Sequence, residues 1–280
     1  MGRVTSRRRV VRAHADGSRT SLVDTLAVEE PLEVRCGGEV LNVTMRTPGD
    51  DFDLVAGWLV SEGVVRDTGD LVSASYCAGR DEQGRQTYNV VDVVLAQGDG
   101  RPGARRPERS TWTSCACGVC GSASLESVKV ASPYDVAADP VEVDVPVLAA
   151  LPGRLREAQQ VFERTGALHA AGLFDVTGTL LCAREDVGRH NAVDKVVGWA
   201  LRDGRLPLSG HVLQVSGRAS FELVQKAVVA GIPVLSAVSA PSSLAAELAA
   251  EAGLTLAGFV RDGGFNLYSR PERVRTPPAR

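Results

Sequence analysis

The chain has 280 residues, of which 44% are apolar and 23% charged, a composition typical of a globular protein with room for two domains. Its net charge of −3 argues against a general nucleic-acid binder. No apolar run approaches the length of a membrane span, and the first twenty residues lack the apolar stretch of a secretory signal. Arg7-Arg8-Arg9 is therefore not expected to be a twin-arginine export signal. We expect a cytoplasmic protein with reduced thiols and no membrane contact.

The N-terminal part of the chain is predicted to be a strand-rich domain over residues 21–139, preceded by a mobile basic tail at residues 1–20. Gly37-Gly38 lies between two extended segments and is a hairpin turn signal. After Asp51, apolar residues recur at helical spacing, which predicts a helix. Residues 97–110 are rich in Gly, Pro and Arg and are expected to form a flexible loop. The predicted strands are 24–30, 32–36, 39–45, 73–77 and 88–95.

The C-terminal part, residues 140–270, is predicted to be an α/β layer domain, with a linker at 140–146 and a C-terminal tail at 271–280. Beyond residue 210, helices and strands alternate, which implies parallel neighbouring strands joined by right-handed crossovers. The expected helices are 152–165, which stops at Gly166, then 190–202, 221–230 and 243–252. The expected strands are 168–174 and 179–183, which form a hairpin, then 211–215, 232–238 and 254–260.

Cysteines dominate the run 113–121, which holds three of the six in the chain: Cys115, Cys117 and Cys120. Cys117 and Cys120 form a Cys-x-x-Cys pair before an expected short helix at 122–129. Structural zinc needs four ligands, and the other cysteines and the four histidines each stand alone in the sequence. A structural disulfide is disfavoured where thiols stay reduced. Reactive thiol chemistry is therefore the leading interpretation of the pair, and we expect no bound metal.

Three loops follow the strands of the predicted C-terminal sheet and carry unusual sequence. Ligands of such sheets bind beyond the carboxyl ends of the strands. Ser216-Gly217-Arg218 offers a close backbone approach and a charge near a helix N-terminus, which suits an anion or phosphate. Residues 239–243 repeat this pattern, and residues 259–266 add paired glycines, Arg261 and two phenylalanines. Each alone also fits an ordinary loop, but three at one sheet edge favour a phosphorylated, nucleotide-like ligand.

The densest polar cluster of the sequence is Glu185-Asp186-Val187-Gly188-Arg189-His190-Asn191. Asp186 or Asn191 could cap the following helix. Helix capping does not explain why Arg189 and His190 are also present. His190 fits a proton carrier near neutral pH and fits a satisfied core histidine equally well.

These segments together resemble the formate dehydrogenase accessory protein family, the FdhD-type sulfur carriers. The resemblance covers nearly everything from residue 25 to residue 270, in order. The matching stretches are EEPLEVRCGGEVLNVTMRTPGDD (29–51), CGVCG (117–121), LHAAGLFD (168–175), REDVGRHNAVDKVVG (184–198), VSGRASFELVQKA (215–227), GIPVLSAVSAPSSLA (231–245) and GLTLAGFVRDGGFN (253–266). One departure is local: Cys115-Ala116 stands where the family usually has serine before CGVC.

The resemblance implies a sulfurtransferase. A cysteine desulfurase would place sulfur on Cys117 as a persulfide, and Cys120 would assist or resolve. The acceptor would be the molybdenum (or tungsten) bis-guanine-dinucleotide cofactor, and the client would be formate dehydrogenase. The resemblance also implies a cytidine-deaminase-like C-terminal domain and a homodimer. The residues that it assigns to cofactor binding are Phe259, Val260, Arg261, Asp262, Gly263 and Gly264, to which Ser216, Gly217 and Arg218 are added as a weaker inference.

Two other functions compete with a sulfur carrier. A zinc deaminase needs His-x-Glu and a downstream Pro-Cys-x-x-Cys, but this chain has His169-Ala170-Ala171, and its only Cys-x-x-Cys lies upstream. A non-catalytic chaperone for the dehydrogenase or its cofactor would keep the ligand-binding loops and would not need Cys117.

Overall fold

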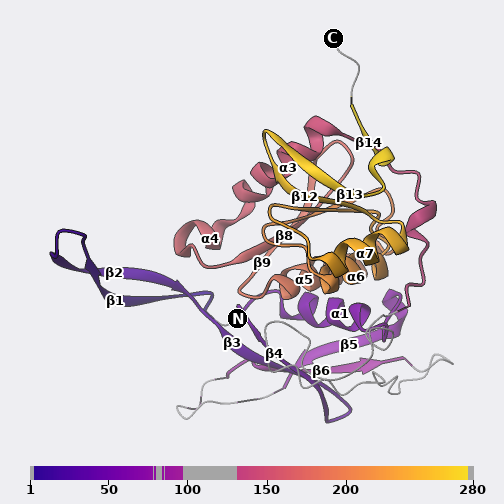
Figure 1. Ribbon diagram of the computed structural model, residues 1–280. Helices are drawn as coiled ribbons and strands as arrows, with labels where there is room; N and C mark the ends of the chain where they lie inside the picture. Colours follow the sequence, from indigo (N-terminus) through magenta and orange to yellow (C-terminus); the bar gives the residue numbers. More distant parts are fainter. Residues whose placement is uncertain (1–2, 78, 80–83, 85, 97–130, 277–280) are drawn as a thin grey trace.

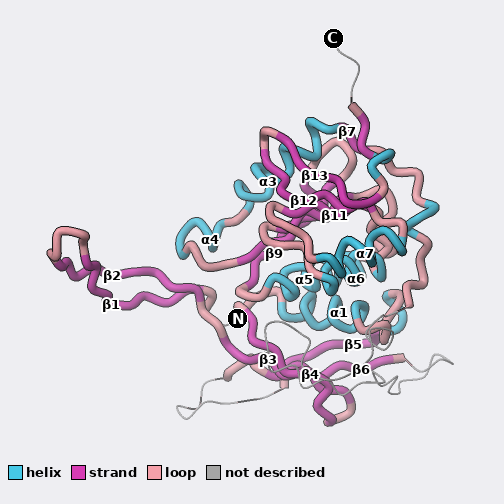
Figure 2. Tube along the Cα trace, in the orientation of Figure 1, coloured by secondary structure: helices cyan, strands magenta, loops and turns pink. Residues whose placement is uncertain are grey.

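The structure is a computed structural model that describes residues 3–77, 79, 84, 86–96 and 131–276. Two sheets are stacked, and two layers of helices lie between them. A further layer of helices covers the outer face of the larger sheet (Figures 1 and 2). A two-stranded hairpin extends away from this body at one side. The chain is therefore a mixed α/β protein.

The smaller sheet is built by the N-terminal part and has the strand order β4-β3-β6-β5. Strands β3 and β6 are parallel, whereas β3–β4 and β5–β6 are antiparallel. Alternate residues of β3, such as Leu32 and Val34, are buried, so one face of the sheet packs into the core. The elements are β3 (Glu30–Cys36), β4 (Glu39–Arg46), α1 (Asp51–Ser61), η1 (Thr68–Asp70), β5 (Leu71–Tyr76) and β6 (Val90–Leu95).

The larger sheet has six strands in the order β13-β12-β11-β10-β8-β9. The central strands β10, β11 and β12 are parallel, as the alternation of helices and strands predicts, and β8 is antiparallel to β10. Helix α3 covers one face, and α5, α6 and α7 cover the other (Figure 1). The strands are β8 (His169–Phe174), β9 (Leu180–Asp186), β10 (Val212–Val215), β11 (Val234–Ala237), β12 (Thr255–Arg261) and β13 (Gly264–Ser269). The helices are α3 (Val145–Ala158), α4 (Gln160–Thr165), α5 (Arg189–Arg202), α6 (Phe221–Val229) and α7 (Ser243–Ala252).

One hydrophobic core joins the two sheets. It includes Leu32 and Val91 of the smaller sheet and Leu213 and Leu235 of the larger one, all fully buried. Helices α1 and α5 pack directly against each other at the centre of this core. The two parts of the chain therefore share apolar burial, although the predicted boundary between residues 139 and 140 stays a prediction.

The first twenty residues differ from the expected mobile tail. Strand β1 (Thr5–Ala13) pairs antiparallel with β2 (Arg19–Ala27), with Thr5 opposite Ala27 and Ala13 opposite Arg19. The two strands form a sheet of their own, which we call the arm. Arginine is compatible with an exposed strand, so the charge of this segment does not prevent pairing.

Ordered structure also replaces the expected linker and C-terminal tail. Within residues 140–146, β7 (Val143–Asp144) pairs with β14 (Val274–Arg275), which belongs to the segment expected to be a tail. Arg273 is buried there and donates hydrogen bonds to the backbone carbonyls of Val136 and Gly253, at 2.7 and 2.9 Å. A buried guanidinium without such acceptors would be costly, so these bonds fix the segment around Arg273 on the body.

Candidate functional site

The three loops that were expected at one sheet edge lie together. The backbone N of Ser239, after β11, donates to the carbonyl of Gly217, after β10, at 3.2 Å. The backbone N of Phe259 in turn donates to the carbonyl of Ser239 at 3.2 Å. These bonds continue the sheet pairing past the strand ends, and they bring residues 216–218 and 259–264 to one edge.

A cavity of about 630 Å³ opens at this edge, between the strand ends and helices α3 and α4. This volume suits a small molecule. Three of the residues predicted to bind a cofactor line it: Ser216, Arg261 and Asp262. The wall opposite is made by α3, α4, the residues between α4 and β8, and the start of β8. Its polar side chains are Arg156, Gln159 and His169. The cavity thus combines two guanidinium groups, an imidazole and a carboxylate.

The other predicted cofactor residues lie around the cavity without lining it. Phe259 is 37% exposed, and its φ of 55° lies in the left-handed region that a bulky side chain rarely adopts. Val260 is fully buried in the core, so its side chain does not reach a ligand. Gly263 and Gly264 form the turn from β12 into β13, a strand that sequence patterns did not indicate. Gly217 packs close to His169, where an added Cβ would lie 3.3 Å from Nδ1.

Sequence patterns missed the contribution of α3 and α4 to the cavity. Arg156 lies over the ring of Phe162 at 4.4 Å from the guanidinium carbon to the ring centroid, and both line the cavity. Such stacking orients a guanidinium while its N–H groups stay available. The expected helix 152–165 contains both residues, but its spacing alone does not show that it faces the loops of the sheet edge.

Basic side chains gather beside His169. Burial lowers the pKa of His169, and the charges of Arg189, His190 and Arg218 lower it further. His190 lies next to Glu222, with 2.8 Å between Nε2 and Oε2, and the same nitrogen is 3.2 Å from Oγ of Ser220. Burial opposes ionisation of Glu222, but its hydrogen bond with His190 and the surrounding positive charges lower its pKa overall. The strand ends therefore carry a positive field suited to an anion.

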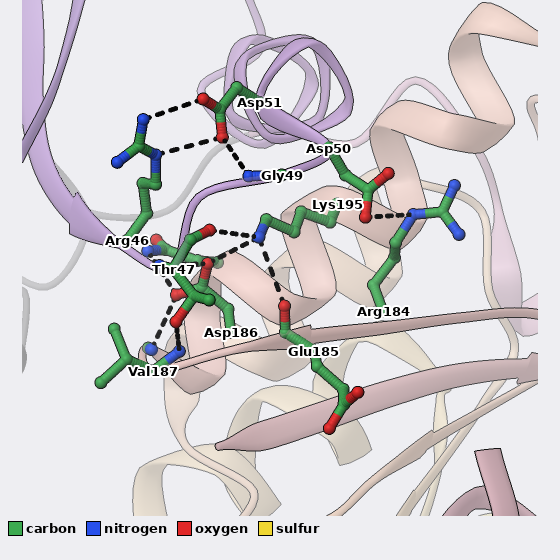
Figure 3. Close-up of polar contacts among 12 residues, drawn as sticks. Arg46, Thr47, Gly49, Asp50, Asp51, Arg184, Glu185, Asp186, Val187 and Lys195 are labelled. Carbon is green, nitrogen blue, oxygen red and sulfur yellow. Dashed lines mark hydrogen bonds and ion pairs between the residues drawn. The ribbon is translucent and has the colours of Figure 1, made fainter. Parts of the chain in front are cut away.

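The segment 184–195 joins the two sheets rather than lining the cavity. Asp186 is fully buried, and its carboxylate lies 2.8 Å from Nζ of Lys195 and accepts from the backbone N of Thr47 at 3.1 Å (Figure 3). Lys195 also donates to the carbonyl of Thr47 at 3.0 Å. Asn191 donates to the carbonyl of Met45 at 2.8 Å, and its amide also reaches Asp186. The polar cluster thus holds the β4–α1 connection against β9 and α5.

Two further charged side chains, those of Arg184 and Asp194, also connect the C-terminal part of the chain to α1. Arg184 of β9 donates to Asp53 of α1 at 2.9 Å. Asp194 of α5 is buried and lies 2.7 Å from Nζ of Lys226, while it accepts from Ser61 of α1 at 2.7 Å. The contacts of Arg184 with Asp53 and of Asp194 with Ser61 join residues more than 100 positions apart, so sequence spacing could not indicate them.

Cys115, Cys117 and Cys120 lie outside the described residues, as do the expected loop 97–110 and helix 122–129. The described residues on both sides of this segment meet at the same turn. The backbone N of Ala96 donates to the carbonyl of Asp70 at 2.8 Å, and the hydroxyl of Tyr134 donates to the carbonyl of Arg66 at 3.1 Å. The segment that carries the Cys-x-x-Cys pair therefore leaves and rejoins the body at one place.

The three cysteines that the structure does describe are poor nucleophile candidates by position. Cys36 and Cys182 are buried, and Cys77 is half-buried. Burial raises the pKa of the Cys182 thiol to about 12, which keeps it protonated at neutral pH. Within the described part of the chain, no group of three or more His, Cys, Asp or Glu side chains is placed to hold a metal ion. None of the helices described there is long and apolar enough to cross a membrane.

The fold and the cavity define an α/β protein with two sheets on one core and an arginine-lined, anion-attracting cavity at the edge of the larger sheet. The sequence matches the FdhD/NarQ family over residues 27–275, and the chain belongs to this family.

Relatives of known name match along nearly the whole chain. The chain is 59% identical to the sulfur carrier protein FdhD of Nocardia farcinica, over 99% of this chain and 98% of the relative. It is 57% identical to the protein of the same name from Streptomyces coelicolor (98% and 97% covered) and 53% identical to that of Mycobacterium tuberculosis (98% and 100% covered). A crystal structure of a candidate formate dehydrogenase accessory protein from Desulfotalea psychrophila has the same fold, with a TM-score of 0.74, 23% identity, and 98% and 100% of the two chains covered.

Proposed function

We propose that this protein is a cytoplasmic sulfurtransferase that carries sulfur to the molybdenum bis-guanine-dinucleotide cofactor of formate dehydrogenase. A cysteine desulfurase loads sulfur onto Cys117 as a persulfide, and the protein delivers it before or during insertion of the cofactor into the dehydrogenase. The names of the relatives and the family support the carrier role. The observation that carries the proposal is the cavity in which Ser216, Arg261 and Asp262 meet Arg156 and His169.

The Cys-x-x-Cys pair fits both halves of such a transfer. In loading, the Cys117 thiolate attacks the outer sulfur of the donor's persulfide, and the donor cysteine leaves as its thiolate. In delivery, Cys120 attacks Sγ of Cys117, the sulfur–sulfur bond of the persulfide breaks, and a Cys117–Cys120 disulfide forms. The outer sulfur then leaves as sulfide, because oxidation of Cys117 and Cys120 to the disulfide provides the two electrons that reduce it. A cellular thiol reductant restores the pair.

The side chains of the cavity are suited to bind the cofactor that accepts the sulfur. Arg156 and Arg261 offer the N–H groups that bind phosphate oxygens, and Asp262 offers an acceptor for the N–H edge of a guanine. We infer that the cavity takes one guanine nucleotide arm of the cofactor, which acts here as a substrate. The positive field around His169 and Arg218 adds to the attraction of the diphosphate. We also infer that the larger sheet and its helices are cytidine-deaminase-like, and that the protein forms a homodimer.

Two other functions are less well supported. A zinc deaminase would place a Glu two residues after His169, and this position is Ala171, which is fully buried in β8. A chaperone without sulfur chemistry would use the same cavity and would leave the Cys-x-x-Cys pair without a role. The chaperone is therefore the alternative that an experiment must separate.

The test is the intact mass of the reduced protein after incubation with a cysteine desulfurase and cysteine, followed by peptide mapping. We expect a gain of about 32 Da, the mass of one sulfur atom, on Cys117. The gain should disappear in Cys117→Ser and persist in the matched variant Cys77→Ser. Addition of the molybdenum cofactor should remove the sulfur from the wild-type protein. Wild-type activation of the dehydrogenase by Cys117→Ser would overturn the carrier mechanism and leave the chaperone.

A further inference from the structure

The arm, with the residues that flank and join its two strands, is the most strongly basic part of the described chain. Residues 3–27 contain six arginines and two aspartates, which gives them a net charge of +4. Since the whole chain carries −3, the remaining residues carry −7. The positive charge is thus concentrated on a feature that extends away from an acidic body (Figure 1).

The two faces of the arm differ. Paired residues of an antiparallel ribbon point to the same side, and alternate residues point to opposite sides. One side, the basic face, therefore carries Arg7, Arg9 and Arg19 together with Val11 and Val23. No acidic residue of either strand lies on the basic face. On the other side, Arg8 lies opposite Asp24, and Val10 lies opposite Leu22, both half-buried.

The basic face has no partner within the part of the chain that the structure describes. Its three arginines are exposed and form no ion pair there. Val11 and Val23 are 64% and 61% exposed, the highest values among the exposed large hydrophobic residues. Both outer edges of the ribbon also lack a neighbouring strand among the described residues. Like charges side by side on a ribbon are unfavourable unless an anionic surface meets them.

The composition of the basic face favours a protein partner over a membrane or a nucleic acid. Arginine is enriched in protein interfaces and lysine is depleted there, and residues 3–27 contain six arginines and no lysine. The exposed large apolar residues of the basic face are valines, whereas membrane-binding segments present Trp, Phe or Leu. It contains no Phe, Tyr or Trp on which a base could stack. The acidic body would also be repelled by a nucleic acid.

The position of the arm indicates which partner it meets. Strand β2 contacts α4, and Phe162 of α4 lines the cavity. A protein held along the arm would therefore lie beside the opening of the cavity. We propose that the basic face of the arm binds an acidic surface of the protein that receives the cofactor, the client formate dehydrogenase. This inference rests on the proposed function for the identity of the partner, and on the charges and contacts above for the surface.

The experiment compares two variants of equal charge. Arg7→Glu/Arg9→Glu reverses two charges on the basic face, and Arg8→Glu/Arg12→Glu reverses two on the opposite face of the same strand. The full chain is titrated against formate dehydrogenase purified from cells that lack this carrier, at about 50 and 200 mM salt, where screening differs. We expect the basic-face variant to lose at least about tenfold in affinity at low salt, since like charges would then face each other. The opposite-face variant should stay within about threefold of the wild type.

Each other outcome overturns the inference. Equal losses in both variants would show a general charge effect or an unfolded arm, and far-ultraviolet circular dichroism would distinguish these. Unchanged binding by the basic-face variant, or no binding by the wild type, would show that the arm does not dock the dehydrogenase. Tighter binding to phosphatidylglycerol vesicles or to duplex DNA, lost on the same substitutions, would assign the arm to a membrane or a nucleic acid. Sedimentation of the basic-face variant as a monomer where the wild type is a dimer would assign it to a second copy.

Failure of the proposed function remains distinguishable from failure of this inference. Under this inference the arm has no part in sulfur loading of Cys117 by the desulfurase, so both variants should gain the same mass as the wild type. A wild-type protein that binds the dehydrogenase through the arm but never gains sulfur would leave the docking surface in place and remove the carrier mechanism.

Discussion

Gly57 and Gly198 face each other where α1 crosses α5, and neither position has room for a side chain. A Cβ on Gly57 would lie 1.8 Å from the backbone oxygen of Asp194, and a Cβ on Gly198 would lie 1.8 Å from that of Asp53. The clashing atoms belong to the opposite helix backbone, which cannot move aside as a flexible side chain can. The close packing of α1 against α5, which joins the two halves of the core, therefore depends on the absence of these two side chains.

Substitution of Gly198 with alanine should destabilise the whole protein. The added methyl group must separate α1 from α5, and overpacking of this kind costs about 1–3 kcal/mol or more. Urea unfolding followed by circular dichroism measures the loss. Gly153→Ala is the matched control, because Gly153 lies in α3 and an added Cβ would meet nothing within 4 Å. Alanine is the better helix former by about 1 kcal/mol, so the control should be neutral or more stable. A similar loss in both variants would contradict the close crossing.

Substitution in the buried ion pair between Asp186 and Lys195 should also lower the free energy of unfolding. Asp186→Asn leaves the Lys195 ammonium buried without its counter-charge, which costs about 3–5 kcal/mol. Unfolding free energy in urea is again the measurement. The control is Glu142→Gln, because Glu142 and its partner Arg275 are about half exposed and such a pair contributes about 0–1 kcal/mol. Asp186→Asn/Lys195→Gln should recover part of the loss, and a double variant no better than the single one would refute a charge effect.

Arginines of the cavity should determine the affinity for a guanine nucleotide. Replacement of Arg156 or Arg261 with glutamine removes a charged donor that lines the cavity, and hydrogen bonds to charged groups contribute about 1.5–3 kcal/mol. We expect guanosine diphosphate to bind at least about tenfold more weakly in calorimetric titration, with unchanged stability. Arg154→Gln is the control on the same helix, because Arg154 donates to the carbonyl of Thr177 and does not line the cavity. Equal affinities in all three variants would place the nucleotide elsewhere.

His169 should make stability fall at mildly acidic pH. Burial, together with Arg189, His190 and Arg218, lowers its pKa in the folded protein below the usual value near 6.5, and Asp186 opposes the shift. The unfolded chain therefore takes up a proton first as pH falls below about 6.5, and the contribution of neutral His169 to stability is lost towards low pH. Unfolding free energies at about pH 7.5 and 5.5 should differ less in His169→Gln than in the wild type. His14→Gln, on the exposed turn of the arm, should keep the wild-type difference.

Local patterns predicted most of the elements and little of what holds them together. The helix after Asp51 and the hairpin at Gly37-Gly38 are confirmed, as are the parallel strands β10–β12, because each depends on a short periodic segment. Helix α3 begins at Val145 rather than at Pro152. Proline is typical of the first turn of a helix, which suggested a start at Pro152, but here Pro152 lies inside the helix. Strand β13 was missed because Gly263-Gly264 fits a ligand-binding loop as well as a turn.

The polar cluster 185–191 shows why the site was harder to predict. Its residue types fit a proton carrier, a helix cap or a buried structural role. Only the position of Met45 and Thr47 in space shows that Asp186 and Asn191 bind the β4–α1 connection. The same holds for Arg156, whose place in the cavity depends on where α3 lies relative to the sheet. The edge loops were predicted correctly as neighbours because the rule for parallel strands fixes which ends meet.

The turn at Arg66–Asp70 also sets a limit on where the proposed sulfur transfer could take place. Both ends of the segment with the Cys-x-x-Cys pair are tied to this turn, and fourteen residues separate Cys117 from Ala131. A chain of that length spans at most about 50 Å when fully extended. If Cys117 carries the sulfur as proposed, the donor that loads it and the acceptor that takes it would both have to come within that distance of this turn.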